Sequence, residues 1–545
     1  MKPKFIVVTG GVLSGLGKGV TTSSIGNLLK AQGYNVTALK MDPYINVDAG
    51  TMRPTEHGEV WVTDDGGETD QDLGNYERFI DITLSKKHSI TTGQLYLTVI
   101  QKERNLEYDG KCVEVIPHIP LEIKRRILDV ANTTKADFVL IEVGGTVGDY
   151  QSILFLEALR ELKREVKDLI FVHVVYLPIP NNLGEMKTKP AQHSIRFLNS
   201  TGIQPDYIIA RASRTIDKVR REKFSFLCNV EDDAVFAAPD VKNIYEVPLL
   251  FERQGLDKKI LSHFGLRYKS NNNRVWKSFI HKLSLLKNEV KIGVVGKYFD
   301  IGDFTLEDSY VSVIEAIKHA SWANNVIPKI QWIDSKQFET NPKSITQLSQ
   351  YDALIIPGGF GGSGVEGKIT AIKYARENNI PLLGLCYGLQ LSVVEFARNV
   401  CNVKDAHTTE INPNTKNPVV IILPEQKKLL EQKQYGASMR LGSYNAILKK
   451  NTKVAQLYKK NEASERHRHR YEVNPDYHQL LEQHGMILSG MSPDGKLVEY
   501  IELPNHPYFV GTQAHPEFTS RPLHPNPLFY GLIEAAKKRA KRSSL

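Results

Sequence analysis

Cysteine is scarce in this chain of 545 residues, and long apolar runs are missing. Four cysteines cannot form a disulfide framework in so long a chain, and their spacing fits no zinc site. They are Cys112, Cys228, Cys386 and Cys401. The longest apolar run, residues 169–177, is interrupted by His173 and is too short to cross a bilayer. The apolar stretch near the start ends too early for a signal peptide. We therefore expect a reducing, cytoplasmic setting and no membrane association.

The excess of positive charge is small. Seventy basic residues against 61 acidic ones give a formal net charge of +9, which suits anionic small substrates, nucleic acid or no particular partner. The basic stretch at residues 537–542 is typical of a solvated, fraying helix end. Because no RNA- or DNA-reading motif accompanies it, we expect no nucleic-acid partner.

The length predicts two large domains, because one hydrophobic core rarely grows to this size. From residue 5 to about residue 265, β-rich runs alternate with helical stretches, and a second such series begins at residue 291. This alternation predicts α/β folds with mainly parallel, doubly wound sheets. We expect a first domain over residues 1–267, a linker with a connecting helix over 268–289, and a second domain over 290–545.

Hydrophobic periodicity places the elements of both domains. In the first domain we expect strands at 5–8, 36–41, 138–143, 169–177 and 207–211, and helices at 19–31 and 152–166. Gly33 is expected to cap the helix at 19–31. A turn at 271–273 and a helix at 275–286 are expected between the domains. In the second domain we expect strands at 291–296, 353–356, 381–385 and 508–511, and helices at 310–323 and 389–398.

A glycine-rich loop follows the first predicted strand and precedes a helix. It runs from Thr9 to Gly19 and carries Lys18 at its end. Backbone N–H groups of such a loop, a helix N-terminus and a mobile lysine together suit phosphate oxygens. The loop departs from the strict phosphate-loop pattern twice, because Val12 replaces its first glycine and Gly19 its serine or threonine. A purely structural turn is the alternative, and the strand–loop–helix context favours a nucleotide.

Two acidic features suit a magnesium ion beside that loop. Glu142 ends an apolar strand, where folds of this type place a metal-organising acid. Residues 64–72 hold five carboxylates and do not have calcium-loop spacing. By itself such a stretch is more often a solvated loop, but next to a triphosphate it becomes a credible metal clamp.

The second domain carries the elements of an acyl-transfer site. Gly384-Leu385-Cys386-Tyr387-Gly388 joins a strand to a helix, which allows a strained nucleophile elbow with the thiol at the N-terminus of the helix. His515-Pro516-Glu517 follows another strand and supplies an imidazole with a carboxylate that orients it. Residues 357–361, rich in glycine, can aim backbone N–H groups at an oxyanion.

Two basic segments remain after these assignments. Residues 187–192 precede a helix, and Lys223 lies in a basic run, but lysines of this kind are usually solvated surface charges. The run Arg466-His467-Arg468-His469-Arg470 lacks cysteine or acidic partners at metal-site spacing, so we assign it to carboxylate or phosphate contacts.

At these residues the chain closely resembles the CTP synthase family. The family's hallmark segments stand at residues 40–48, 57–60, 144–149, 187–192, 466–473 and 515–518, so that the resemblance covers nearly the whole chain. It implies a P-loop-like synthetase (amidoligase) domain with a deviant phosphate loop, followed by a class I glutamine amidotransferase domain. It also implies a ligase in which ATP phosphorylates O4 of UTP and ammonia from glutamine then displaces the phosphate to give CTP. Mg²⁺, GTP as activator of glutamine hydrolysis, CTP as feedback inhibitor and a homotetramer able to form filaments follow from the same resemblance.

The resemblance assigns roles to positions that match the family's motifs. The catalytic residues are Cys386, His515, Glu517, Lys18 and Lys40. The ATP-binding residues are Gly15, Leu16, Gly17, Lys18, Gly19, Val20, Asp72, Pro239, Asp240 and Val241. The UTP- and CTP-binding residues are Ser14, Asp149, Tyr150, Gln151, Lys187, Thr188, Lys189, Pro190, Ala191, Gln192 and Lys223. The metal ligands are Asp72 and Glu142. The glutamine-binding residues are Gly359, Tyr387, Gly388, Leu389, Gln390, Glu410 and Arg470. Positions associated with an ammonia passage are Pro54, His57 and Val60.

The chain departs from the usual family residues at a few of these positions. Gly15 replaces a common serine, Ala191 a common threonine and Tyr387 a common leucine. Asp149-Tyr150-Gln151 replaces a common Asp-Ile-Glu. These departures bear on CTP inhibition and glutamine affinity and leave the catalytic residues intact.

Two other readings stay open from the sequence. One is another ATP-dependent amidotransferase of similar build, such as a cobyrinate or cobyric acid amidase, which needs no lysine site for a second triphosphate. The other is a non-catalytic phosphate-loop partner fused to a pseudo-glutaminase, which the intact Cys386, His515 and Glu517 disfavour.

Overall fold

The structure is a computed structural model that describes residues 2–182, 184–269, 273–296, 300–301, 304–305, 310–422, 426 and 438–543. The chain divides into two compact units. Unit 1 comprises Met1–Ala49 and Asp72–Lys282, and unit 2 comprises Gly50–Gln71 and Leu283–Leu545. The segment Gly50–Gln71 therefore packs with the second half of the chain, although it lies inside the first domain expected from the sequence.

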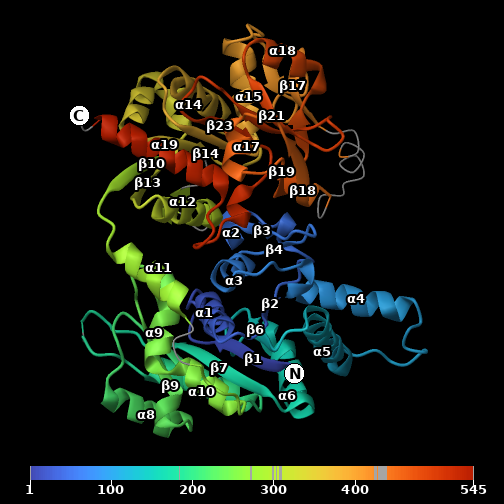
Figure 1. Cartoon of the computed structure of the whole chain (residues 1–545). Coiled ribbons are helices and arrows are strands. Elements are labelled where there is room, and N and C mark those ends of the chain that lie inside the picture. The colour runs from blue at the N-terminus through green and yellow to red at the C-terminus, as the bar shows by residue number, and fades with distance from the viewer. Residues whose placement is uncertain are drawn as a thin grey trace. The chain divides into compact units, whose positions relative to one another are not determined.

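Unit 1 is built on a parallel sheet of the order β5-β2-β6-β1-β7-β8-β9 (Figure 1). All of its neighbouring strands pair in parallel. The strands are β1 (Lys4–Gly10), β2 (Val36–Asp42), β5 (Ser89–Thr91), β6 (Phe138–Val143), β7 (Leu169–Tyr176), β8 (Tyr207–Ala212) and β9 (Val235–Pro239). Because parallel strands end at the same edge, the loops after β1, β2, β6 and β9 meet at one edge of this sheet.

Helices cover both faces of this sheet. Phe5, Val7 and Leu39 point into a core shared with α5 and α6, while Gly26 of α1 lies against Leu140 on the opposite face. The helices of unit 1 are α1 (Lys18–Ala31), α3 (Asp72–Ile80), α4 (Thr92–Arg104), α5 (Val115–Thr134), α6 (Ile153–Val166), α7 (Lys189–Ser200), α8 (Lys218–Cys228), α9 (Val247–Gln254) and α10 (Leu256–His263). Helix α11 (Arg274–Ser284) follows and ends just beyond the unit's last residue.

Unit 2 contains a larger mixed sheet of the order β13-β10-β14-β15-β23-β22-β21-β18-β19. The part from β13 to β23 is parallel, and the part from β23 to β19 is antiparallel. The strands are β10 (Glu289–Gly296), β13 (Ile327–Asp334), β14 (Ala353–Ile356), β15 (Leu382–Leu385), β18 (Arg440–Leu448), β19 (Glu462–His469), β21 (Ile487–Met491), β22 (Val498–Glu502) and β23 (Phe509–Thr512). Two smaller sheets are also described. Strand β11 (Asp300–Ile301) pairs with β12 (Phe304–Thr305), and β17 (Asn417–Ile422) lies between β16 (Ala406–Thr408) and β20 (Tyr471–Val473).

The parallel part of this sheet is also covered on both faces. Leu354 and Leu382 face one core, and Ile355 and Leu383 face another that includes residues of α12 and α19. The helices are α12 (Val311–Ala323), α13 (Lys336–Thr340), α14 (Val365–Glu377), α15 (Tyr387–Asn399), α17 (Lys453–Tyr458), α18 (His478–Gln483) and α19 (Pro527–Ser543). The segment Gly50–Gln71 adds α2 (Pro54–His57) and the antiparallel hairpin of β3 (Val60–Val62) and β4 (Glu68–Asp70).

The predicted α/β class is confirmed, and the predicted strands and helices lie within about two residues of the observed ones. Gly33 follows α1 with a φ of 90°, as expected for a capping glycine. The turn predicted at 271–273 lies mostly outside the described residues. Among the residues that the structure describes, no helix is long and apolar enough to cross a membrane.

Candidate functional site

The glycine-rich loop of unit 1 connects β1 to α1 as predicted. Gly17 precedes the helix with a φ of 83°, and the Lys18 ammonium donates a 2.7 Å hydrogen bond to the Gly145 carbonyl. A Cβ at Gly19 would lie 2.2 Å from a carboxylate oxygen of Asp72. This close approach explains why glycine replaces the serine or threonine of the usual pattern.

A buried charge cluster lies beside this loop. The Lys40 ammonium hydrogen-bonds to Asp72 and lies 3.6 Å from carboxylate oxygens of both Asp42 and Glu142. The Tyr76 hydroxyl donates to Glu142. Burial lowers the pKa of Lys18, although the charge of Glu142 opposes that effect. The predicted metal ligands and both predicted lysines are thus brought together.

The chemistry of this cluster fits a divalent cation. Burial and repulsion by Asp72 raise the pKa of Glu142 to about 8. The buried Glu142 and the partly exposed Asp72 repel one another. A bound cation, which also takes phosphate oxygens and water, would relieve this repulsion. Among the described residues, no group of three or more His, Cys, Asp or Glu side chains forms a metal site. Any cation would therefore depend on Asp72 and Glu142 together with oxygens from a ligand.

The positions assigned to the pyrimidine nucleotide are more dispersed. Ser14, Asp149, Tyr150 and Gln151 are exposed, and so are Lys189 and Lys223. Lys187 pairs with Glu185 at 2.6 Å, Gln192 donates to the Thr188 hydroxyl, and Ala191 is fully buried. Pro190 lies in the first turn of α7.

His173 is a buried residue that the sequence did not single out. Its ring nitrogens lie 2.8 Å from the hydroxyls of Thr9 and Ser194, and burial lowers its pKa to about 3. Neutral His173 therefore connects the end of β1, where the loop begins, to α7, which carries assigned pyrimidine positions.

The assigned ATP positions lie at the carboxyl edge of the sheet. Leu16 is buried, whereas Gly15 is exposed and Val20 is half-buried at the start of α1. Pro239 ends the edge strand β9, and Asp240 and Val241 follow it. The Arg211 guanidinium holds the Asp240 carboxylate at 2.9 Å. These two sets come from loops after β1 and β9, which β7 and β8 separate.

The predicted nucleophile elbow is present in unit 2. Cys386 joins β15 to α15 with a φ of 48° and a ψ of −98°, a strained conformation for a residue with a side chain. A Cβ at Gly388 would lie 2.2 Å from the Ile356 carbonyl oxygen, and one at Gly384 would lie 2.8 Å from the Gly388 backbone. Both flanking glycines are therefore required for this turn.

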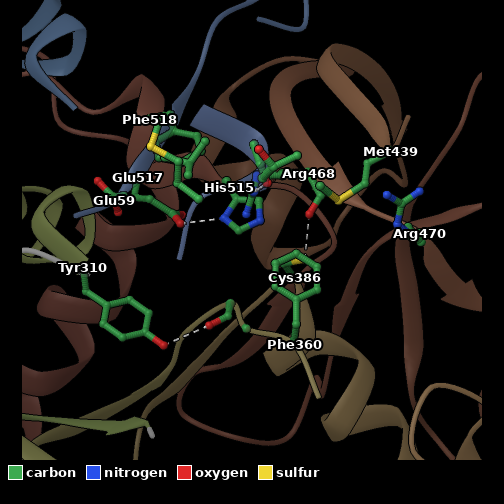
Figure 2. A pocket seen from close by; sticks show the side chains of 16 residues that line it. Glu59, Tyr310, Phe360, Cys386, Met439, Arg468, Arg470, His515, Glu517 and Phe518 are labelled. Atoms are coloured by element: carbon green, nitrogen blue, oxygen red, sulfur yellow. Dashed lines mark hydrogen bonds and ion pairs between the residues drawn. The ribbon is translucent and has the colours of Figure 1, made fainter. Parts of the chain in front are cut away.

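The histidine and glutamate also take the predicted arrangement (Figure 2). His515 Nδ1 lies 2.7 Å from a carboxylate oxygen of Glu517. Burial alone would lower the pKa of His515, but the charges of Glu517 and Cys386 raise it to about 10. Among the described residues His515 Nε2 has no hydrogen-bond partner, so it is available to exchange a proton with the thiol.

Cys386 and His515 line a cavity of about 520 Å³, whose wall also includes Gly359, Phe360 and Arg470 (Figure 2). Of the residues assigned to glutamine, Gly359 and Arg470 line this cavity. Tyr387, Gly388, Leu389 and Gln390 are buried in α15 behind the nucleophile. Glu410 accepts a 2.7 Å hydrogen bond from the Gly361 N–H, so it shapes the glycine-rich turn.

Several neighbours of the catalytic residues were not predicted. The Gln513 amide donates to the Cys386 sulfur at 3.7 Å, and the sulfur lies 3.9 Å from the Arg468 carbonyl oxygen. The Phe518 ring stacks on the His515 ring at a centroid distance of 5.4 Å. Arg468 and Phe518 lie in segments that the sequence analysis singled out, whereas Gln513 carried no sequence signal.

The basic run at 466–470 makes the carboxylate contacts that were predicted. Arg466 pairs with Asp64, and Arg468 pairs with Glu68 at 2.8 Å. Both carboxylates belong to the segment Gly50–Gln71 of the same unit.

Comparisons with known proteins cover both units. Residues 4–266 match the family described as CTP synthase N-terminus, and residues 305–535 match the class I glutamine amidotransferase family. The chain is 52% identical over 538 residues to a CTP synthase of Pyrococcus abyssi, with 98% of each chain covered. It is 49% identical to a CTP synthase of Methanococcus maripaludis over 98% of this chain and 99% of that protein. It is 50% identical to a CTP synthase of Methanocaldococcus jannaschii, with 98% of each covered.

Proposed function

Because the chain belongs to the CTP synthase family, we propose that it aminates UTP to CTP with ATP and with ammonia released from glutamine. The observation that carries the proposal is the intact Cys386, His515 and Glu517 arrangement in a chain half identical to curated CTP synthases over nearly its whole length. We call the glycine-rich loop of unit 1 with Lys18 and Lys40 the loop-and-lysine site, and the cavity of unit 2 around Cys386 the cysteine site. These two sites match the two halves of that reaction.

The cysteine site performs the release of ammonia. The Cys386 thiolate attacks the amide carbon of glutamine, and the imidazolium of His515 donates a proton to the departing nitrogen. Ammonia leaves, and water then attacks the thioester carbonyl carbon and releases glutamate and the thiol. Backbone N–H groups of the turn that includes Gly359 stabilise the oxyanion. Arg470, on the cavity wall, is placed to bind the carboxylate of glutamine.

Replacing Glu517 by glutamine should move the pH dependence of glutamine hydrolysis. Glu517 raises the pKa of His515, so its loss lowers that pKa from about 10 and the imidazolium is lost at a lower pH. We expect kcat to fall by about 10²-fold and the alkaline limb of kcat/KM to move by about one pH unit or more towards neutrality. An unchanged alkaline limb in a folded variant would show that Glu517 does not act through the charge of His515.

The loop-and-lysine site performs the activation of UTP. In the proposed step, O4 of UTP attacks the γ-phosphorus of ATP and ADP leaves, which gives a 4-phosphorylated pyrimidine. Ammonia then attacks C4, inorganic phosphate departs, and loss of a proton gives CTP. Lys18 and Lys40 offset negative charge on the transferring phosphoryl group.

Asp72 and Glu142 would hold Mg²⁺ at this site. The raised pKa of Glu142 supports this assignment, because a nearby cation would stabilise its charged form. When bound, the ion supplies positive charge that stabilises the phosphate oxygens of ATP.

The proposed function also includes regulation and assembly: GTP is the activator, CTP is the inhibitor, and the protein is a homotetramer able to form filaments. The proposed location is cytoplasmic, and the proposed domain limits are 1–267, 268–289 and 290–545. No nucleic-acid or membrane partner is proposed.

Feedback inhibition should respond to residue 151. Gln151 is exposed after Asp149, whose carboxylate accepts the Thr146 N–H at 3.2 Å and is therefore partly engaged. A charge-assisted hydrogen bond contributes about 1 kcal/mol more than a neutral one. Gln151→Glu should therefore strengthen CTP inhibition about three- to tenfold, with little change in the UTP concentration for half-maximal rate. An inhibition constant that stays the same or rises would show that Asp149 or another group sets feedback strength.

The proposed function is tested by mixing UTP, ATP, Mg²⁺ and glutamine and following CTP formation by absorbance. CTP should form only when UTP, ATP, Mg²⁺ and a nitrogen source are present, and either glutamine or added ammonium should serve as that source. Turnover with corrinoid acids in place of UTP would instead place the chain among the cobyric acid amidases. Glutamate release without any amination would exclude the synthetase half of the proposal.

A further inference from the structure

We propose that the segment Gly50–Gln71 is a structural part of the glutamine-hydrolysing site, in which Trp61, Asp64 and Glu68 are positioning residues for Cys386 and His515. The segment lies in the same compact unit as those catalytic residues. This inference deepens the proposed glutaminase step and rests on it.

Strand β19 is an edge strand of the large sheet. Within the described residues β19 pairs with β18 alone. The Arg466 carbonyl accepts a 2.7 Å hydrogen bond from the backbone N–H of His515, and the Arg468 carbonyl oxygen lies 3.9 Å from the Cys386 sulfur. A shift of β19 would therefore displace both catalytic residues.

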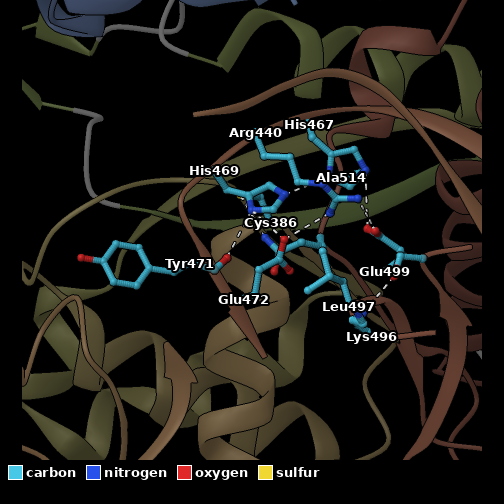
Figure 3. Close-up of polar contacts among 12 residues, drawn as sticks. Cys386, Arg440, His467, His469, Tyr471, Glu472, Lys496, Leu497, Glu499 and Ala514 are labelled. Atoms are coloured by element: carbon cyan, nitrogen blue, oxygen red, sulfur yellow. Dashed lines mark hydrogen bonds and ion pairs between the residues drawn. The ribbon is translucent and has the colours of Figure 1, made fainter. Parts of the chain in front are cut away.

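One face of β19 is held by a buried polar cluster (Figure 3). His467 and His469 contact each other at 2.8 Å, and they lie 3.5 Å from Glu499 and Glu472 respectively. Arg440 bridges the two glutamates at 2.7 and 3.1 Å. Burial lowers the pKa of both histidines well below the usual value, so they are neutral. Burial also raises the pKa of Glu499, and it raises that of Glu472 to about 8, although the charge of Arg440 opposes both shifts.

The opposite face of β19 is held by the segment Gly50–Gln71, which contains the hairpin of β3 and β4. Arg466 pairs with Asp64 and lies over the Trp61 ring at 5.2 Å, and its side chain is only 1% exposed. Arg468 pairs with Glu68, whose side chain is also 1% exposed, and donates a further hydrogen bond to the Gly50 carbonyl. Removing either carboxylate takes an ion-pair partner from an arginine side chain that is largely buried, so the strand must rearrange.

A second route reaches the catalytic histidine through aromatic rings. Trp61 packs on Phe518 at a centroid distance of 5.0 Å, and Phe518 stacks on the imidazole of His515. The hairpin turn is fixed by a 2.8 Å hydrogen bond from the Ser443 N–H to the Asp64 carbonyl. The hairpin therefore contacts Arg466, Arg468 and Phe518, and each of these three residues in turn contacts His515 or Cys386.

Because these contacts position the catalytic residues, their loss should change the rate of glutamine hydrolysis more than the affinity for glutamine. A displacement of about 1 Å at a reacting group can cost about 10²-fold in rate. Neither Glu68 nor Trp61 lines the cavity, so we expect neither side chain to contact bound glutamine. We therefore expect Glu68→Gln to lower kcat for glutamine hydrolysis about tenfold or more and to change KM by less than about threefold. CTP formation from ammonium should stay within about twofold of the parent enzyme.

Matched variants separate positioning from general loss of structure. Glu462→Gln removes one carboxylate at the exposed start of the same strand and should leave both activities unchanged. Trp61→Phe keeps a ring against Phe518 and should retain most glutaminase activity. Trp61→Leu removes the ring and should lower kcat for glutamine hydrolysis by as much as Glu68→Gln does.

The experiment is run on the full chain, with thermal unfolding measured for each variant. If Glu68→Gln does not fold, the Trp61 pair decides the question. Equal glutaminase kcat in parent, Glu68→Gln and Trp61→Leu would overturn the inference, and so would a change confined to KM. If the parent releases no glutamate from glutamine, the proposed function itself fails, and that result is distinct from the others.

Discussion

Replacing Cys386 by alanine should abolish CTP formation from glutamine and leave formation from added ammonium intact. The substitution removes the sulfur that attacks the amide, and no other described thiol lies in the cavity. Cys386 is only 3% exposed and sits in a strained turn, so the smaller alanine is accommodated without a clash. We expect the glutamine-dependent rate to fall by at least about 10³-fold and the ammonium-dependent rate to stay within about twofold.

The measurement compares CTP formation with the two nitrogen sources in the same preparation. Thermal unfolding of Cys386→Ala and of a Cys401→Ala control establishes that both variants are folded, since Cys401 is a buried cysteine away from the cavity. Loss of both activities in folded Cys386→Ala would show that this residue does more than release ammonia.

Lys18→Ala should abolish CTP formation with either nitrogen source. The Lys18 ammonium lies at the start of α1 among Lys40, Asp72 and Glu142, where the transferring phosphoryl group is proposed to bind. Its loss removes positive charge that offsets the developing charge on phosphate, for which we expect a decrease of about 10³-fold or more.

Basal release of glutamate from glutamine is the internal control for this variant. It should remain measurable in Lys18→Ala, because Lys18 belongs to unit 1 and the cysteine site to unit 2. Normal turnover with ammonium in Lys18→Ala would rule out the phosphate assignment of the loop.

Sequence periodicity predicted most of the parallel strands of both units, but it missed β5, β9 and β13. Runs such as 138–143 and 353–356 are apolar on both faces, as strands covered by helices on both sides must be. The antiparallel extension of unit 2 was not predicted. Strand β19 reads Glu-Ala-Ser-Glu-Arg-His-Arg-His, and its buried polar residues hide the alternation that usually marks a strand.

The same contrast holds for the candidate sites. Cys386, His515 and Glu517 were predicted because each follows a strand in a motif with a chemical rationale. The contacts of Asp64 with Arg466 and of Glu68 with Arg468 were not paired in advance, because 402 and 400 residues separate the partners. Their charges were recognised and the run was assigned to carboxylate contacts, but pairing at such separations is set by the fold and leaves no local pattern.

Glutamine with an isotopic label in its amide nitrogen tests the central claim most directly. With UTP labelled by heavy oxygen at O4, ATP and Mg²⁺, the enzyme should place the nitrogen label in the exocyclic amine of CTP and the oxygen label in inorganic phosphate. Mass spectrometry of both products reads out the two transfers in one reaction. CTP without the nitrogen label, or phosphate without the oxygen label, would contradict the proposed coupling of glutamine hydrolysis to phosphorylation of UTP.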